Sequence, residues 1–107
     1  MAETFPLASI DALVIDTDHN YWTLQQELRA FHDKLAPQAL VFLHDTVIYA
    51  HRSEYAYQYG VDVPYPLEKM VLFQDKGLVD AVQDDPRYQI LEQSDESCGA
   101  MALRKAT

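Results

Sequence analysis

The segment from residue 12 to residue 46 constrains the fold of this chain more than any other. Residues 12–15 and residues 39–43 are two short apolar runs, and residues 21–35 between them repeat apolar side chains at spacings of three and four. The repeated side chains are Leu24, Leu28, Phe31 and Leu35. This spacing predicts an amphipathic helix. Two apolar strands joined by one helix predict a βαβ unit with parallel neighbouring strands, buried on both faces.

The residues around this helix predict its limits. Asn20 or Asp18 is suited to accept hydrogen bonds from the backbone N–H groups of the first turn. Pro37 is expected to stop the helix after Leu35. The side opposite the apolar stripe is polar, so we expect His32 to lie on the solvent face.

The rest of the chain predicts smaller elements. Residues 47–65 hold five of the seven tyrosines without clear periodicity, which favours either a binding loop or tyrosines packed at an oligomer interface or sheet edge. Residues 67–73 fit a strand or a helix equally well. Residues 77–84 predict a short helix, and residues 88–92 and 100–104 predict an antiparallel hairpin.

Polar side chains follow both predicted strands of the βαβ unit. Asp16, Asp18 and His19 come directly after the first strand, and His44 and Asp45 come after the second. Ligands of open parallel sheets bind outside the carboxyl ends of the strands, so this rim is the predicted site. The competing interpretation is that the aspartates after the first strand cap the helix and the His-Asp pair closes a turn.

Two histidines and two residues after the second strand are also candidates for a site. His19 and His51 are candidate bases, because histidine titrates near neutral pH. Thr46 and Tyr49 either line a substrate pocket or serve as ordinary turn and packing residues. The sequence alone leaves these interpretations open.

Length and charge narrow the class of protein. The 107 residues predict a single domain over residues 1–107, with 49% apolar residues and 23% charged residues as in ordinary globular proteins. The net charge of −9 argues against nucleic acid and against an anionic membrane as partners. We expect a cytoplasmic protein for three reasons. The sequence has a single cysteine, it has no apolar run of about 18 residues, and it does not start with the basic segment typical of a signal peptide.

The rim motifs carry a family resemblance. The Asp-Thr-Asp-His sequence at 16–19 and the His-Asp-Thr sequence at 44–46 resemble the ends of the fourth and fifth strands of class I S-adenosylmethionine-dependent methyltransferases. The small O-methyltransferase-like branch has Asp-Gly-Asp-His and His-Asp-Thr at these points. Residues 77–82 and 98–104 resemble the closing helix and hairpin of that family, and the resemblance covers about residues 11–105.

The resemblance implies the fold class and the site. The fold would be α/β, a partial Rossmann-like methyltransferase sheet of strands four to seven with an antiparallel last hairpin and flanking helices. Asp16, His44 and Asp45 would bind a divalent cation, Mg²⁺ or Mn²⁺, with the histidine nitrogen favouring the latter or iron or zinc. Asp18 would either support the cation ligands from behind or face a small-molecule substrate, and Asp18 and His19 are the candidate catalytic residues.

The resemblance also implies what the chain lacks. The N-terminal half that binds the cofactor in this family has a Gly-rich turn, and Gly60, Gly77 and Gly99 form no such turn. We therefore expect a methyltransferase-like protein that binds S-adenosylmethionine weakly or not at all by itself, so its activity as an enzyme stays open. The alternatives are a non-catalytic self-associating module and, less favoured, a metal-dependent hydrolase. Such a half-sheet would leave the apolar strand at residues 12–15 as an open edge, which predicts either a homo-oligomer through that strand or partial cover of the strand by residues 1–10.

Overall fold

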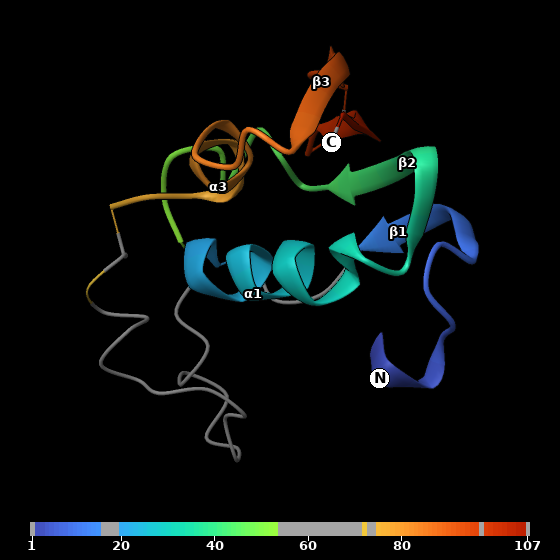
Figure 1. The fold of residues 1–107 in the computed structure, drawn as a ribbon. Helices are drawn as coiled ribbons and strands as arrows, with labels where there is room; N and C mark the ends of the chain where they lie inside the picture. The colour runs from blue at the N-terminus through green and yellow to red at the C-terminus, as the bar shows by residue number, and fades with distance from the viewer. Residues whose placement is uncertain (1, 16–19, 54–71, 73–74, 97, 107) are drawn as a thin grey trace.

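The computed structural model describes residues 2–15, 20–53, 72, 75–96 and 98–106. These residues form a mixed α/β structure in which, within the described ranges, α1 (Tyr21–His32) and α3 (Leu78–Gln83) pack against a four-stranded sheet (Figure 1). The chain begins with a short 3₁₀ helix, η1, at Ala2–Thr4. Within the described residues, no helix is long and apolar enough to cross a membrane.

The predicted βαβ unit is confirmed. β1 (Ile10–Ile15) leads into α1 (Tyr21–His32), and β2 (Leu35–His44) pairs with β1 in parallel. The N-cap of α1 is Asn20, whose side chain accepts hydrogen bonds from the backbone N–H groups of Trp22 and Thr23.

The end of α1 differs from the prediction. The helix stops at His32, and Leu35 is a fully buried residue of β2 instead of the last residue of the helical stripe. The cause is tertiary: the carbonyl of Lys34 accepts hydrogen bonds from the backbone N–H groups of Ser9 and Ile10, which draws this segment out of the helix. Pro37 does not stop the helix but lies within β2, where the register with β1 shifts.

The closing elements match the sequence pattern. α3 (Leu78–Gln83) buries Leu78, Val79 and Val82, as predicted. β3 (Tyr88–Ser94) and β4 (Ala100–Lys105) form the predicted antiparallel hairpin. β4 pairs antiparallel with β2, so the strand order is β1-β2-β4-β3.

The core lies on one face of this sheet. Alternate strand residues, Val41, Leu43, Met101 and Leu103 among them, are buried with the apolar faces of α1 and α3. No helix covers the other face among the described residues. On that face Val14 is 71% exposed, and Phe42, the residue of β2 that pairs with Val14, is 38% exposed. The prediction that β1 is buried on both faces is therefore wrong, because the described chain covers only one side.

Candidate functional site

The candidate site is the rim where β1 and β2 end. The parallel register places Ile15 opposite Leu43, so both strands finish at the same edge of the sheet. His44 is the last residue of β2, and Asp45 follows it. Asp16, Asp18 and His19 lie outside the described residues, so the structure places only the second half of the predicted site.

His44 and Asp45 face each other. Nδ1 of His44 lies 3.2 Å from Oδ1 of Asp45, with the histidine side chain 60% exposed and the aspartate side chain 19% exposed. The backbone N–H of Asp45 donates to the carbonyl of Gly99, which ties the turn to the hairpin. Asp45 adopts a left-handed conformation with φ of 58°, which aspartate tolerates better than most residues. The two residues therefore form a pair within a fixed turn, with an accessible imidazole.

The residues after this pair support α3. Thr46 is buried, and the carbonyls of Tyr49 and Ala50 accept hydrogen bonds from the first N–H groups of α3, at 2.7 and 3.0 Å. Nδ1 of His51 lies 2.9 Å from Oδ1 of Asp80 on α3. These contacts favour a structural role for this segment and leave His51 facing a carboxylate of its own chain.

The first turn of α1 forms a polar cluster next to the rim. The hydroxyl of Tyr21 donates to Oδ2 of Asp84 at 2.7 Å, and Nζ of Lys76 donates to the same oxygen at 3.3 Å. Burial, together with the hydrogen bond to Asp84, raises the pKa of Tyr21 to about 12. Its phenol is therefore protonated at neutral pH and acts as a hydrogen-bond donor, not as a base.

Two buried polar atoms lie close to the same turn. Nδ2 of Asn20 and Oγ1 of Thr23 have no hydrogen-bond partner in the part of the chain that the structure describes. The side-chain oxygen of Asn20 does have partners, because it accepts the hydrogen bonds that cap α1. The prediction that Asn20 or Asp18 caps α1 is thus confirmed for Asn20, while the capping interpretation of Asp16 and Asp18 falls outside the described residues.

An apolar hollow of about 340 Å³ opens on the uncovered face of the sheet, beside His44. Val14, Phe42 and Ala102 contribute apolar walls, and Glu92 and Ser94 contribute polar ones. An apolar small molecule seated there would have the imidazole of His44 at its margin. No group of three His, Cys, Asp or Glu side chains suited to a metal ion occurs among the described residues, which leave out Asp16.

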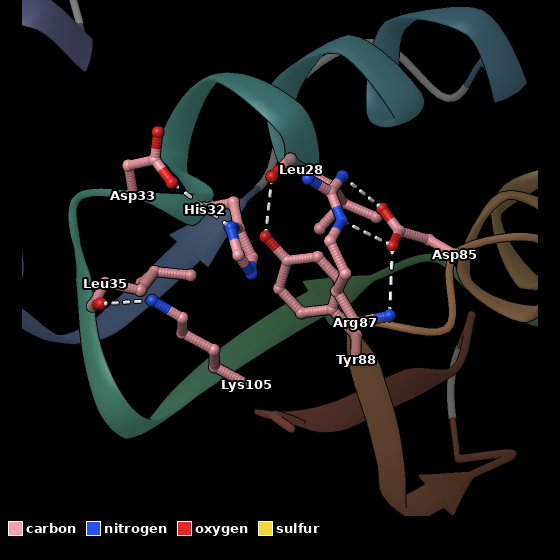
Figure 2. Close-up of polar contacts among 8 residues, drawn as sticks. All are labelled: Leu28, His32, Asp33, Leu35, Asp85, Arg87, Tyr88 and Lys105. Atoms are coloured by element: carbon pink, nitrogen blue, oxygen red, sulfur yellow. Dashed lines mark hydrogen bonds and ion pairs between the residues drawn. The ribbon is translucent and has the colours of Figure 1, made fainter. Parts of the chain in front are cut away.

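A second polar cluster joins α1 to the start of β3 (Figure 2). The hydroxyl of Tyr88 donates to the carbonyl of Leu28, and His32 packs edge-on against the Tyr88 ring, with ring centroids 5.9 Å apart. The side chain of His32 is 14% exposed and its Nε2 is buried, so the prediction of a solvent-facing histidine is wrong. Tyr88 provides the cover, and it comes from a part of the chain remote in sequence.

Asp85 and Arg87 form the charged part of this cluster. Nε and an Nη of Arg87 donate to the two carboxylate oxygens of Asp85 at 2.9 and 2.8 Å, a two-bond pair drawn in Figure 2. These hydrogen bonds lower the pKa of Asp85 below its usual range, although burial opposes the shift. The sequence pattern gave no sign of a role for either residue.

The Asp85→Asn variant should lose about 1–3 kcal/mol of unfolding free energy at pH 7, since it removes a charge-assisted pair. A carboxyl whose pKa is lower in the folded state stabilises the fold above the unfolded pKa of about 4, and the effect is lost as pH falls through the folded value. Urea unfolding from pH 7 to about pH 3 should therefore show the two proteins converging. Asp95→Asn, at an exposed position, is the control. An equal penalty at both ends of the pH range would contradict this origin.

One comparison with known proteins identifies a related domain. A family model described as a methyltransferase domain matches residues 1–46. This segment contains β1, α1 and β2, and it ends just after the His44–Asp45 pair. The match supports a methyltransferase domain. No curated protein matches the chain.

Proposed function

We propose that this chain is a methyltransferase-like protein of the O-methyltransferase type, whose sheet corresponds to strands four to seven of that fold. The observation that carries the proposal is the family match over the βαβ unit, with the antiparallel hairpin β3–β4 next to β2 in the same sheet. The proposed partner is a small-molecule substrate, not nucleic acid or a membrane, in keeping with the net charge of −9. The proposed compartment is the cytoplasm.

The proposed cation ligands are Asp16, His44 and Asp45. A bound divalent cation would lower the pKa of a substrate hydroxyl and orient it. The exposed imidazole of His44, 3.2 Å from Asp45, supports a mixed nitrogen and oxygen ligand set of the kind that Mn²⁺ accepts more readily than Mg²⁺. Asp18 and His19 are the proposed substrate-facing residues.

We further propose that the chain does not bind S-adenosylmethionine by itself. A Gly-rich turn holds a cofactor because the missing side chains leave its backbone open to close approach. Gly77 and Gly99 are used differently: an added Cβ would lie 2.0 Å from the carbonyl oxygen of Tyr49 or 2.5 Å from the backbone nitrogen of Val47. Both glycines accommodate the chain's own backbone, and the described residues offer no fit for the cofactor.

Calorimetric titration with S-adenosylhomocysteine, with and without Mn²⁺ or Mg²⁺, tests this proposal. We expect no heat of binding under any of these conditions. Micromolar binding would contradict the cofactor statement and would favour an active enzyme.

Titration with Mn²⁺ alone tests the cation ligands. We expect Asp45→Asn and Asp16→Asn to weaken Mn²⁺ binding at least about tenfold, and Asp95→Asn to leave it unchanged. Equal binding by the wild type and all three variants would overturn the proposed ligand set.

The second candidate function is a non-catalytic self-associating module derived from the same fold. The exposed Val14 on β1 favours it, because an uncovered apolar strand invites pairing. A stable oligomer that binds neither S-adenosylhomocysteine nor Mn²⁺ would select this candidate over the enzyme.

A further inference from the structure

The two edge strands of the sheet differ in how they are protected. β3 carries Glu92 beside the polar residues Gln93 and Ser94, and has a register irregularity between Ile90 and Glu92. Charges and bulges of this kind prevent an edge from pairing with another chain. β1 has an apolar stretch at residues 12–15, and its pairs from Ala12 to Ile15 are regular. β1 also has Asp11 and a register shift between Ile10 and Ala12 near its start, so within the described residues only its stretch from Ala12 to Ile15 lacks such protection.

The uncovered apolar surface is centred on β1. The exposed fraction falls from 71% at Val14 to 38% at Phe42 on the neighbouring strand. On the side of α1, a groove of about 590 Å³ runs between η1, β1 and α1 and is lined by Phe5, Leu13 and Phe31. Val14 lines both this groove and the hollow on the other face. Apolar surface is thus available on both sides of the open edge.

We propose that a second copy of this chain occupies this edge, through antiparallel pairing of β1 with β1 of the partner into one eight-stranded sheet. A strand added here must be apolar on both faces, because it meets the groove on one side and Val14 on the other. β1 itself meets that requirement: Val14 points to the uncovered face, and Ile15 is buried in the core. The inference rests on the second candidate function, the self-associating module, and specifies its geometry; it requires no cofactor or cation.

Charge and register restrict how two such strands can pair. A twofold axis normal to the sheet keeps each side chain on its own face, so the pairing is centred on one residue. Centring on Asp11 would set two carboxylates opposite each other, which is unfavourable. Centring on Leu13 pairs residues 11–15 with the same residues of the partner and places Asp11 opposite the partner's Ile15, which keeps the two Asp11 carboxylates apart. Centring on Ala12 would draw in Ile10, where the pairing with β2 shifts.

The size of the contact predicts its strength. Five paired residues span about 16 Å of edge. Such a strip alone falls short of the roughly 800 Å² per partner of a stable interface, so the groove beside β1 must contribute. We therefore expect a concentration-dependent dimer. Because each copy has a net charge of −9, added salt should strengthen the dimer by screening repulsion.

Sedimentation velocity over about 1–200 µM tests the dimer in this reversible range. We expect wild-type chain to dimerise and Val14→Lys to remain monomeric. Leu91→Lys, an exposed apolar position on the opposite edge strand, is the matched control and should dimerise as the wild type does. A monomeric wild type throughout this range, or equal disruption by both variants, would overturn the proposal.

Cysteine trapping tests the geometry independently of any loss of folding. In a Cys98→Ser background, Leu13→Cys should form a covalent dimer on oxidation, because a residue at the twofold axis faces its own copy at about 4.5–5.5 Å between Cα atoms. Gln93→Cys on β3 should not. The Phe42→Lys variant should still dimerise. If this variant is monomeric and the Leu13→Cys variant forms no disulfide, the two copies stack face to face, and edge pairing is refuted.

Discussion

The Gly77→Ala variant is expected to lose at least about 3 kcal/mol of unfolding free energy, a large effect for a single substitution. The added Cβ would lie 2.0 Å from the carbonyl oxygen of Tyr49, 2.5 Å from the nitrogen of Arg52 and 2.6 Å from the carbonyl carbon of Ala50. All three contacts are with backbone, so no side-chain rotation relieves them. The φ angle of Gly77 is an ordinary −128°, which makes the expected loss one of space and not of backbone conformation.

Urea unfolding of the purified variant measures this loss. Gln83→Ala, at an exposed position of the same short helix, is the control and should stay within about 0.5 kcal/mol of the wild type. A Gly77→Ala penalty below about 1 kcal/mol would show that α3 can move away from the 49–52 backbone at little cost.

The expected loss matters for the candidate site because α3 and the rim share one support. The first two N–H groups of α3 donate to the carbonyls of Tyr49 and Ala50, a few residues after the His44–Asp45 pair. His51 adds its contact with Asp80 on α3. A side chain at Gly77 would push these segments apart, so it should loosen the turn that holds Asp45 even though Gly77 contacts no proposed ligand.

Much of the fold follows from local patterns in the sequence. The apolar runs of β1 and β2 and the helical stripe between them predict the βαβ unit, because a parallel pair needs a crossover of this length. The hairpin β3–β4 follows from two strand-like segments separated by a turn that contains Gly99, which has a positive φ of 95°. In both cases the decisive residues are close in sequence.

The errors arise where distant segments decide the structure. The helical spacing continues to Leu35, but hydrogen bonds from Ser9 and Ile10 to the carbonyl of Lys34 end the helix and begin β2. A continuous apolar run predicts a strand buried on both faces, yet Val14 is largely exposed because the described chain covers one side of the sheet. Hydrophobicity shows which surface needs cover and does not show whether the chain supplies that cover.

Some features of the candidate site could be predicted from the sequence, and others could not. Topology alone places the ends of β1 and β2 at one rim, so the sequence suffices to predict that His44 and Asp45 lie at that edge. The contact of His32 with Tyr88 and the pairing of Asp85 with Arg87 needed the packed structure, since the first joins residues far apart in sequence and the second depends on a local turn. The sequence Asp85-Pro86-Arg87 alone does not signal such a pair.

The Leu24→Ala variant is the second change expected to have a large effect, a loss of about 2–5 kcal/mol. Leu24 is 1% exposed and belongs to the core cluster that joins α1, the buried face of β2 and α3. Truncation of Leu24 removes apolar contacts and leaves a cavity between α1 and the sheet. The described residues cover the sheet on one face only, so this core is the one that holds α1 and the sheet together within them. Against a typical domain stability of about 5–15 kcal/mol, such a loss is a large fraction of the total.

Urea unfolding of Leu24→Ala beside Arg29→Ala, an exposed position of the same helix, separates core packing from helix propensity. We expect Arg29→Ala to change stability by less than about 0.5 kcal/mol, because alanine is a good helix former and the position is open to solvent. If Leu24→Ala costs no more than Arg29→Ala, α1 does not hold the βαβ unit together through this core. The rim formed by the ends of β1 and β2 would then need another source of rigidity, and pairing of β1 with a second copy is the one that the open edge offers.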